Sequence, residues 1–260
     1  MSEGDPTEIA SRLRAAGSVF AEDEAELLRA ASHGDRDLEA MVQRRIVGEP
    51  IEHIVGWAEF CGLRIVVGPG VFVPRRRTEH LVDEAVKLLT AGAIVVDLCC
   101  GSGAVAVAIA ATTPGLRVHA ADIDPVAVAC ARLNLEPLGG TVHEGDLFAA
   151  LPAALRGHIG LLVVNAPYVP TAAIEMMPRE ARLHEPLSTL DGGADGLDIQ
   201  RGVAHGAPEW LAAAGHIVIE TSADQSAVTR SIFEDAGLSA RIVSSHDLDA
   251  TVVICTSSQD

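Results

Sequence analysis

The chain lacks the segments that direct a protein into or across a membrane. Its 260 residues contain no apolar run of the ~18 residues or more that a spanning helix needs. The opening residues, MSEGDPTEIA, have neither the basic start nor the apolar stretch of a secretory signal. We therefore expect a soluble, cytoplasmic protein that has no contact with a membrane.

Cysteine pairs and histidine clusters are also missing. The five cysteines are odd in number and form no C-x-x-C pair, so we expect reduced, mostly buried thiols. The adjacent Cys99 and Cys100 are interpreted as two small apolar residues in a tight loop. No two of the ten histidines lie within five residues of each other, which argues against the ligand spacing of a zinc site. No metal is expected.

Basic residues are in the minority. The chain has 19 Lys and Arg against 36 Asp and Glu, which gives a formal net charge of −17. Nucleic-acid affinity comes largely from basic side chains that displace counterions from phosphates. We therefore expect no stable nucleic-acid partner. The charge favours a partner that is small, neutral or basic, such as a cationic protein. The run Arg75-Arg76-Arg77 is a candidate for a local basic patch.

The residues that are present indicate a small helical part followed by a larger one. Residues 7–47 alternate charged and apolar groups at helical spacing, which predicts two or three short helices. Residues 51–73 read as β-like runs broken by glycine and proline, which predicts a small hairpin. The runs are Ile54-Val55, 63–67 and 71–73, and a helix is expected at 78–90. The predicted parts are a helical N-terminal domain (1–50), a β-hairpin linker (51–76) and a main domain (77–260).

The main domain alternates predicted strands and helices. The apolar runs lie at 93–98, 116–121, 160–164 and 215–219. The helical patterns lie at 104–112, 125–135, 197–213 and 223–236. Strands that are apolar throughout and are separated by helices predict an α/β fold with a parallel sheet covered on both faces. Two final runs, near 239–244 and 250–256, predict an antiparallel hairpin that closes one edge of this sheet.

A glycine turn joins the first strand of the main domain to its helix. Gly101 and Gly103 permit close backbone approach to a ligand that lies over the end of the strand. Asp122, nineteen residues past Gly103, ends the next predicted strand, where its carboxylate can accept hydrogen bonds from both hydroxyls of a ribose. The segment 101–106 also matches the loose G-x-G-x-x-G/A pattern of NAD-binding enzymes.

Asp97 favours a different cofactor. A loop that binds a pyrophosphate has no use for a carboxylate just before its glycines, whereas a cofactor with a methionine ammonium group and a sulfonium does. We therefore favour S-adenosylmethionine over NAD, and a turn without a ligand would leave Asp97 and Asp122 unexplained. Asp146 follows the short third strand, near the expected adenine, where Leu147 or Phe148 could pack against the base. Alternatively, Asp146 caps the next helix.

The segment 161–168 is the most informative. It ends a buried strand with a polar residue, a rigid turn and the only tyrosine of the chain. Two hydrogen-bond acceptors, the Asn165 side-chain oxygen and the Ala166 carbonyl, could hold the two N–H groups of a planar amide or amine and stabilise positive charge that develops on its nitrogen. Pro167 favours an extended Ala166, and Tyr168 can pack on a flat acceptor. The alternative is an ordinary Asn/Pro turn.

These residues resemble the HemK-like (PrmC-like) protein glutamine N5-methyltransferases, which modify the GGQ glutamine of peptide-chain release factors. The similarity covers about 48–260 and includes 48–53, Glu59-Phe60, 73–79, the Asp97 loop, Asp122, 165–168 and Glu185-Pro186-Leu187. It implies a Rossmann-like class I methyltransferase domain, with a seven-stranded, mostly parallel sheet and a small helical N-terminal domain that grips the protein substrate. It also implies that S-adenosylmethionine is converted to S-adenosylhomocysteine and that a release factor is the partner.

The resemblance also assigns site residues by position. It places cofactor binding at Asp97, Cys99, Gly101, Gly103, Asp122, Ile123, Asp146, Leu147 and Asn165. It assigns the binding of the target glutamine to Asn165, Ala166, Pro167 and Tyr168. It places the substrate pocket between the domains at Phe72, Pro74, Arg75, Thr78 and Glu79.

Four departures from the family pattern stand at or near these positions. Ala166 replaces the first proline of N-P-P-Y, which keeps the backbone acceptor but adds an N–H and frees φ. Cys99 replaces the first glycine of the loop. Arg76 and Arg77 replace a proline and an acidic residue, and His184 replaces an aromatic residue. The last two changes bear on the acceptor more than on the reaction, and they are compatible with a divergent paralogue.

Other acceptors and functions stay open at this point. Enzymes that methylate a base amine of the adenine N6 type use a similar Asn-Pro-Pro-aromatic motif. Another protein or a small-molecule nitrogen is also compatible with the residues. A protein that holds the cofactor without turnover, and an NAD-linked oxidoreductase, are the two remaining alternatives.

Overall fold

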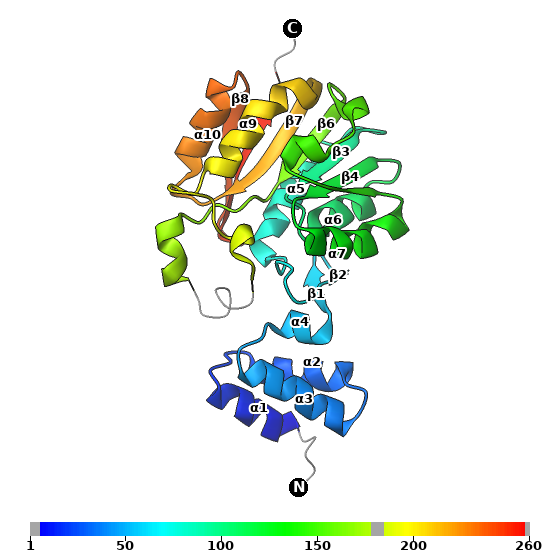
Figure 1. Cartoon of the computed structure of the whole chain (residues 1–260), viewed down its shortest axis with the longest axis vertical. Helices are drawn as coiled ribbons and strands as arrows, with labels where there is room; N and C mark the ends of the chain where they lie inside the picture. The colour runs from blue at the N-terminus through cyan, green and yellow to red at the C-terminus, as the bar shows by residue number, and fades with distance from the viewer. Residues whose placement is uncertain (1–5, 178–184, 258–260) are drawn as a thin grey trace.

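The computed structural model of the protein describes residues 6–177 and 185–257 (Figure 1). The helices are α1 (Pro6–Ala15), α2 (Ala21–Ala31), α3 (Asp35–Ile46), α4 (Ile51–Val55), α5 (Glu79–Val86), α6 (Ala104–Thr112), α7 (Pro125–Leu135), α9 (Asp198–Trp210) and α10 (Ser226–Asp235). The strands are β1 (Trp57–Phe60), β2 (Leu63–Val66), β3 (Ile94–Leu98), β4 (Arg117–Asp122), β5 (Thr141–Glu144), β6 (Ile159–Val164), β7 (Leu211–Thr221), β8 (Ser239–Ser245) and β9 (Ala250–Thr256). Short 3-10 helices include η1 (Arg76–Thr78), η3 (Leu147–Ala150), η5 (Thr171–Met176) and η6 (Leu187–Thr189). None of the helices in the described ranges is both long and apolar enough to span a bilayer.

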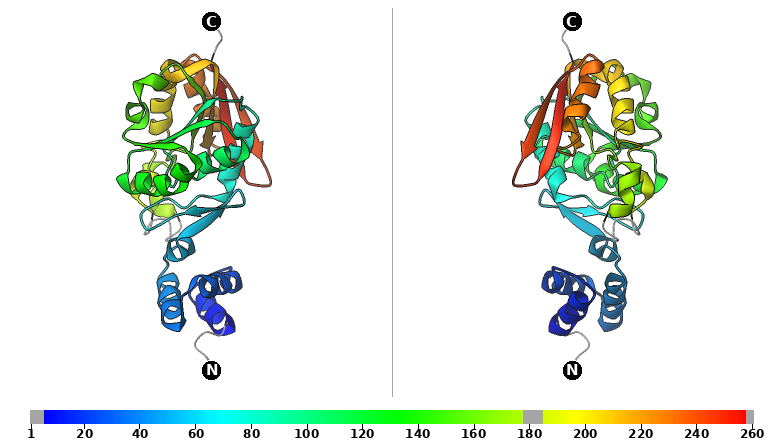
Figure 2. Two further views of the ribbon diagram at one scale, coloured as in Figure 1. Left: turned by 90° about the vertical axis from the view of Figure 1, so that its right-hand side faces the viewer. Right: turned by 90° about the vertical axis from the view of Figure 1, so that its left-hand side faces the viewer.

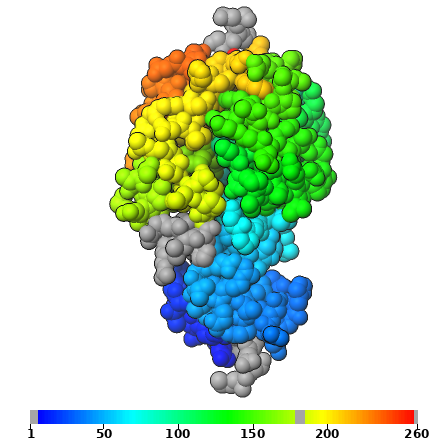
Figure 3. All heavy atoms as spheres, in the orientation of Figure 1, coloured from blue at the N-terminus to red at the C-terminus, as the bar shows by residue number. Residues whose placement is uncertain are grey.

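The first four helices gather at one end of the molecule (Figure 3). They enclose a hydrophobic cluster of their own, which includes Ile9, Leu13 and Leu28, all at most 1% exposed. Acidic residues stand in the first turn of α1, α2 and α3 and basic residues in the last, as the helix dipole favours. Apolar spacing and charge placement therefore both support the helices that the sequence predicted there.

A two-stranded hairpin links the helical end to the sheet (Figure 2). Its strands β1 and β2 are antiparallel, and the turn residues Cys61 and Gly62 both have positive φ, 50° and 71°, as a type I′ turn requires. The prediction of β structure is wrong at Ile54-Val55, because these residues belong to α4, and at 71–73, which belong to no strand. Pro50 precedes that helix and a left-handed Gly56 ends it, which are helix boundary signals that outweigh a two-residue apolar run.

The main domain contains one seven-stranded sheet in the order β5-β4-β3-β6-β7-β9-β8. The first five strands run parallel, and β9 is antiparallel to both β7 and β8. The predicted parallel sheet with an antiparallel edge hairpin is therefore confirmed. Successive residues of β3 supply opposite faces, since Val95 packs in one core layer and Val96 in the other. Burial on both faces is why the strands are apolar throughout.

The two layers of helices differ in their members. Helices α5, α6 and α7 contribute to the core layer of Val95. Helices α9 and α10, with η3, contribute to the layer of Val96, on the other face of the sheet (Figure 1). The expected helix at 197–213 ends early, at Trp210, because the chain turns directly into β7 and pairs with β6. Ala214, with φ of 56°, lies in the irregular part of that pairing.

The strand order reverses between the neighbouring strands β3 and β6. From β3 the chain continues to β4 on one side of this pair, and from β6 it continues to β7 on the other side. In doubly wound sheets, a crevice opens at this reversal, outside the carboxyl ends of the strands. Leu98 at the end of β3 pairs with Val164 at the end of β6. The fold therefore brings the Asp97 glycine loop and the Asn165 segment together.

Candidate active site

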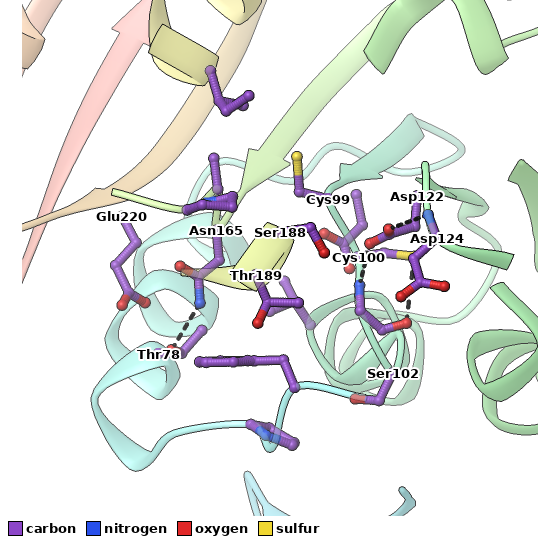
Figure 4. Close-up of a pocket in the computed structure, with 18 of the residues that line it drawn as sticks. Thr78, Cys99, Cys100, Ser102, Asp122, Asp124, Asn165, Ser188, Thr189 and Glu220 are labelled. Carbon is purple, nitrogen blue, oxygen red and sulfur yellow. Dashed lines mark hydrogen bonds between the residues drawn. The ribbon is translucent and has the colours of Figure 1, made fainter. Parts of the chain in front are cut away.

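A pocket lies at the carboxyl ends of the parallel strands. Its lining comes from the loops after β3, β4, β5 and β6, from the segment around η1, from η6, and from the end of β7. In the close-up, Cys99, Cys100, Asp122 and Asp124 lie at one end, and Thr78, Asn165 and Glu220 lie at the other, with Ser188 and Thr189 between them (Figure 4). One continuous pocket thus joins the two groups of residues that the sequence singled out.

Most of the predicted site residues line this pocket. They are Phe72, Pro74, Arg75, Thr78, Asp97, Cys99, Gly101, Asp122, Ile123, Asp146, Leu147, Asn165, Ala166, Pro167 and Tyr168. Gly103 and Glu79 do not line it. Gly103 has a φ of +76° and begins α6, and a Cβ there would come within 3.2 Å of Ala131 Cβ, so its glycine serves helix packing. The Glu79 carboxylate accepts a hydrogen bond from the Cys61 N–H at 3.0 Å, which ties α5 to the hairpin.

Asp97 is the most deeply buried carboxyl group in the pocket lining, with 1% of its surface exposed. Its carboxylate accepts a hydrogen bond from the Ala106 N–H at 3.1 Å, at the start of α6. Burial raises its pKa to about 8, and the nearby Asp122 acts in the same direction, while the Ala106 hydrogen bond opposes them. Because no cation among the described residues compensates the charge, the ionised form is best stabilised by a positively charged ligand.

Asp122 holds the glycine loop in place. One carboxylate oxygen accepts from the Gly101 N–H at 2.8 Å, and the other accepts from the Asp124 N–H at 3.0 Å. Burial raises the pKa of Asp122, and these backbone hydrogen bonds oppose the rise. A carboxylate has about four lone-pair sites, so these backbone groups leave room for a hydroxyl group of a ligand.

The loop between the two aspartates has a tight backbone. Cys99 and Gly101 both have positive φ, 58° and 54°. A side chain at such a φ is strained, so the cysteine occupies a position that favours glycine. Burial, followed by the charges of Asp122 and Asp97, raises the pKa of the Cys99 thiol. The thiol is therefore held in its neutral form, in agreement with the interpretation of this pair as small apolar residues.

The loop after β5 places Asp146 and Leu147 on the pocket. The Asp146 side chain makes no capping hydrogen bond to η3, so the alternative that it serves as a helix cap is wrong. Leu147 has a φ of 44°, which turns the chain sharply at this point. Phe148 instead packs in the core, where its ring stacks on Trp210 at a centroid distance of 5.6 Å. Of the two candidates for an adenine contact, only Leu147 faces the pocket.

The other end of the pocket contains polar groups in contact with each other. The Asn165 Nδ2 donates a hydrogen bond to Thr78 Oγ1 at 3.2 Å. The Tyr168 hydroxyl donates to Glu220 Oε1 at 3.2 Å. The Arg77 guanidinium lies 3.5 Å from the same Glu220 oxygen and 5.8 Å from the centre of the Tyr168 ring. Burial, followed by the charge of Glu220, raises the pKa of Tyr168, so the phenol stays protonated.

The basic run at the rim is largely neutralised. Arg75 forms an ion pair with Glu185, which is buried, and lies 5.1 Å over the Phe72 ring. Arg77 pairs with Glu220. Two of the three arginines are thus engaged within the protein, which weakens the case for a nucleic-acid patch here. His184 lies outside the described residues. Within the described ranges, no three His, Cys, Asp or Glu side chains gather in a way that could hold a metal ion.

Sequence reasoning missed several polar residues that line the pocket. Among them are Ser102, Asp124, Ser188, Thr189 and Glu220. Glu220 could have been found, because it directly follows the predicted strand at 215–219, as Asp122 and Asn165 follow theirs. Ser188 and Thr189 belong to η6, which reaches the pocket from a segment that has no strand end to identify it.

The known proteins that resemble this chain are methyltransferases. A family model described as the methyltransferase small domain matches residues 62–195. The release factor glutamine methyltransferase of Streptomyces coelicolor is 38% identical over 242 residues, which cover 86% of this chain and 86% of that protein. The 4-amino-L-phenylalanine/4-methylamino-L-phenylalanine methyltransferase of Streptomyces pristinaespiralis is 36% identical over 203 residues, which cover 75% of this chain and 69% of that protein. A solved methyltransferase from Pyrococcus furiosus shares the fold, with a TM-score of 0.58 at 16% identity over 83% of this chain and 97% of that one.

Proposed function

The chain belongs to the release factor glutamine methyltransferase family, and on this premise we propose which of its residues carry out the reaction. The enzyme uses S-adenosylmethionine and methylates the side-chain amide nitrogen (N5) of a glutamine, which leaves S-adenosylhomocysteine. The proposed acceptor is the glutamine of the GGQ motif in a peptide-chain release factor. The observation that carries the proposal is the shared pocket, which has Asp122 at one end and Asn165 at the other (Figure 4) and includes Asp97, close enough to Asp122 to feel its charge.

The residues at the first end fit a cationic nucleoside cofactor. In our proposal, Asp97 binds the ammonium group of the methionine part, because none of the residues that the structure describes provides a cation for its buried carboxylate. Asp122 accepts hydrogen bonds from the ribose hydroxyls, while Leu147 packs against the adenine and Asp146 binds its polar edge. When bound, the cofactor supplies an electrophilic methyl group.

The residues at the second end hold the acceptor nitrogen. An amide nitrogen is a weak nucleophile, because its lone pair is delocalised; a rotation barrier of ~18–20 kcal/mol measures this resonance. The Asn165 Oδ1 and the Ala166 carbonyl would accept its two N–H bonds and stabilise the positive charge that develops on it. Tyr168 would pack on the flat amide. No strong base is required, since the surplus proton can leave to water after transfer, and positioning provides much of the catalysis.

A second acceptor class is favoured by one specific observation. The Arg77 guanidinium lies beside the Tyr168 ring and its side chain is 49% exposed, so it can also reach a ligand. A free aromatic amino acid would offer it a carboxylate, as well as a flat amine for Asn165. The relative from Streptomyces pristinaespiralis carries such a substrate in its name. A glutamine within a protein chain has no carboxylate to offer, and for this reason Arg77→Gln separates the two classes.

The proposed function is tested by incubating the enzyme with radiolabelled S-adenosylmethionine and three acceptors, which are a release factor, 4-amino-L-phenylalanine and a mixture of DNA and RNA. We expect label in the release factor, mapped by peptide mass spectrometry to the GGQ glutamine. A release factor with that glutamine changed to glutamate is the matched control and should stay unlabelled. Label only in the amino acid, lost with Arg77→Gln, would establish the second class instead. Label only in nucleic acid would overturn both.

A further inference from the structure

The segment that we assign to the acceptor nitrogen, residues 165–168, is anchored at both of its ends. Its first end continues from β6, which pairs with β3 on one side and with β7 on the other. Just past its second end, the Val169 N–H donates a hydrogen bond to the Leu190 carbonyl at 3.1 Å. Between the two anchors, Ala166 has the free φ that a proline would remove. The direction of the Ala166 carbonyl therefore depends on how firmly the anchors hold the backbone.

A glycine-rich turn, residues 192–196, packs directly against the second end of this segment. A Cβ built at Gly192 would lie 2.7 Å from the Pro167 carbonyl oxygen, and a Cβ built at Gly196 would collide with the Tyr168 carbonyl oxygen. Because only glycine has no Cβ, only glycine allows the turn to approach this backbone so closely. The turn therefore supports the acceptor segment by direct contact with its main chain.

The side chain of Gln225 joins the acceptor segment to this turn. Its Nε2 donates hydrogen bonds to the Tyr168 carbonyl at 2.9 Å and to the Asp195 carbonyl at 3.0 Å. Its Oε1 accepts a hydrogen bond from the Ser222 hydroxyl at 2.7 Å. A carbonyl can only accept, so both N–H groups of the amide are directed to these two carbonyls. One side chain thus connects two backbone segments that lie 57 and 30 positions from it in the sequence.

Tyr168 is consequently held through its side chain and through its backbone. Its hydroxyl donates to Glu220 Oε1 at 3.2 Å, and its carbonyl accepts from Gln225 at 2.9 Å. Both partners belong to one short stretch of chain, which runs from the end of β7 to the start of α10. The ring that we expect to pack on the acceptor is therefore fixed at two points.

We infer that Gln225 is a positioning residue that fixes the backbone of residues 165–168. Through the Tyr168 carbonyl, it sets the direction of the Ala166 carbonyl and the place of the Tyr168 ring. The inference rests on the proposed function in so far as this segment is taken to hold the methyl acceptor. The anchoring itself is a property of the protein alone.

The first test removes the hydrogen bonds of Gln225 and keeps the size of its side chain. Gln225→Met should lower kcat by about three- to tenfold, which corresponds to the loss of one ordinary hydrogen bond. Gln225→Glu has the same shape, but at neutral pH its carboxylate would face two carbonyl oxygens, so the loss of kcat should be larger. The affinity for S-adenosylmethionine, measured by calorimetry, should stay unchanged in both variants, because Gln225 is not among the residues that line the pocket.

Gln43→Met is the matched control for this replacement. Gln43 also donates a side-chain hydrogen bond, to Glu39 at 2.8 Å, but it belongs to α3 in the helical end of the molecule. We expect this variant to keep the kcat of the unmodified enzyme. An unchanged kcat in both Gln225 variants, or an equal loss of cofactor affinity in them, would overturn the inference.

The second test needs no acceptor, so it distinguishes failure of the inference from failure of the proposed function. Tyr168 is the only tyrosine of the chain, and incorporation of 3-fluorotyrosine therefore places 19F on this ring alone. We expect Gln225→Met and Gln225→Glu to shift and broaden the 19F signal, because the ring then samples more positions, and Gln43→Met to leave it in place. A signal unchanged in both Gln225 variants would contradict the inference, whichever acceptor the enzyme uses. A changed signal in an enzyme that methylates no release factor would support the anchoring and count against the proposed function alone.

Discussion

The two ends of the pocket are built in different ways. The proposed cofactor end is formed by the ends of the neighbouring strands β3 and β4, where the N–H groups of Gly101 and Asp124, 21 and 2 positions away in the sequence, converge on Asp122. The acceptor end depends on side chains far apart in the sequence. Asn165 and Thr78 are separated by 87 positions, and Tyr168 and Glu220 by 52. The pairing of two neighbouring strands can therefore define where the cofactor binds. The acceptor site needs residues from η1, from the loop after β6 and from β7, so it forms only when more of the sheet is assembled.

This difference predicts that changes at the two ends have separable effects. Cofactor-end variants should alter affinity for S-adenosylmethionine and leave turnover at saturation largely intact. Acceptor-end variants should lower turnover and leave the affinity for S-adenosylmethionine largely intact. Each prediction below tests this separation, beginning with the largest expected effect.

Asn165→Ala should lower kcat by about 10²-fold or more, by analogy with the loss of one preorganised hydrogen-bond partner of the developing charge. The affinity for S-adenosylmethionine, measured by calorimetry, should be nearly unchanged. Asn134→Ala is a matched control, because that asparagine does not line the pocket and bonds to backbone groups of neighbouring residues, such as Val66 and Ser102. It should lower the melting temperature without a comparable loss of kcat. Unimpaired turnover in Asn165→Ala would remove Asn165 from the mechanism.

Asp122→Ala should weaken cofactor binding by about 10- to 100-fold, since hydrogen bonds to a charged group are lost. It also leaves the Gly101 and Asp124 N–H groups without their acceptor, so the loop is expected to loosen. Asp122→Asn retains one acceptor oxygen and should show a smaller effect. Calorimetric titration with S-adenosylhomocysteine measures both. Normal affinity together with a loss of kcat would reverse the assignment of the two ends.

The affinity for the cofactor should depend on pH through Asp97. The pKa of this group is about 8 without a ligand, so at pH 7 it is mostly protonated. A bound ammonium group favours the carboxylate, and binding at pH 7 should therefore release roughly one proton. The affinity should rise by up to about tenfold per pH unit toward pH 8 and level off above it.

Titrations in buffers with different heats of ionisation measure this proton release directly. Asp97→Asn, which cannot ionise, should abolish the release and flatten the pH dependence. The raised pKa of Asp97 also affects the stability of the folded protein. Because the folded-state pKa lies above the unfolded-state value, the cofactor-free protein should lose stability as the pH rises from about 4 to about 8. A pH-independent affinity in the unmodified enzyme would show that Asp97 does not meet a cation.

Ala166→Pro should have the smallest effect. The substitution restores the residue usual in the family, and the Ala166 N–H donates to no described residue, so no hydrogen bond is lost. The carbonyl that we assign to the acceptor nitrogen remains. We expect kcat and KM to stay within about threefold of the unmodified enzyme. A collapse of activity would show that the Ala166 N–H takes part in acceptor binding.

The comparison of the two ends also explains how far the sequence could be interpreted. The sheet was predictable, because strands buried on both faces are apolar throughout, and the cofactor end was predictable from Asp97, Gly101 and Asp122. The hairpin was placed partly wrongly, since Ile54-Val55 is too short a run to separate strand from helix. Glu220 was missed although it follows a predicted strand, and its partners Arg77 and Tyr168 come together only in the folded sheet.

The most direct test of the account is a crystal structure of the enzyme with S-adenosylhomocysteine and a peptide that contains the GGQ glutamine. We predict that the homocysteine amino group lies against Asp97 and the ribose against Asp122. The glutamine side-chain nitrogen should lie within hydrogen-bond distance of Asn165 Oδ1 and the Ala166 carbonyl, on the side of the product sulfur. A glutamine bound elsewhere, or an Asn165 amide turned with its NH2 group toward the peptide, would contradict the account.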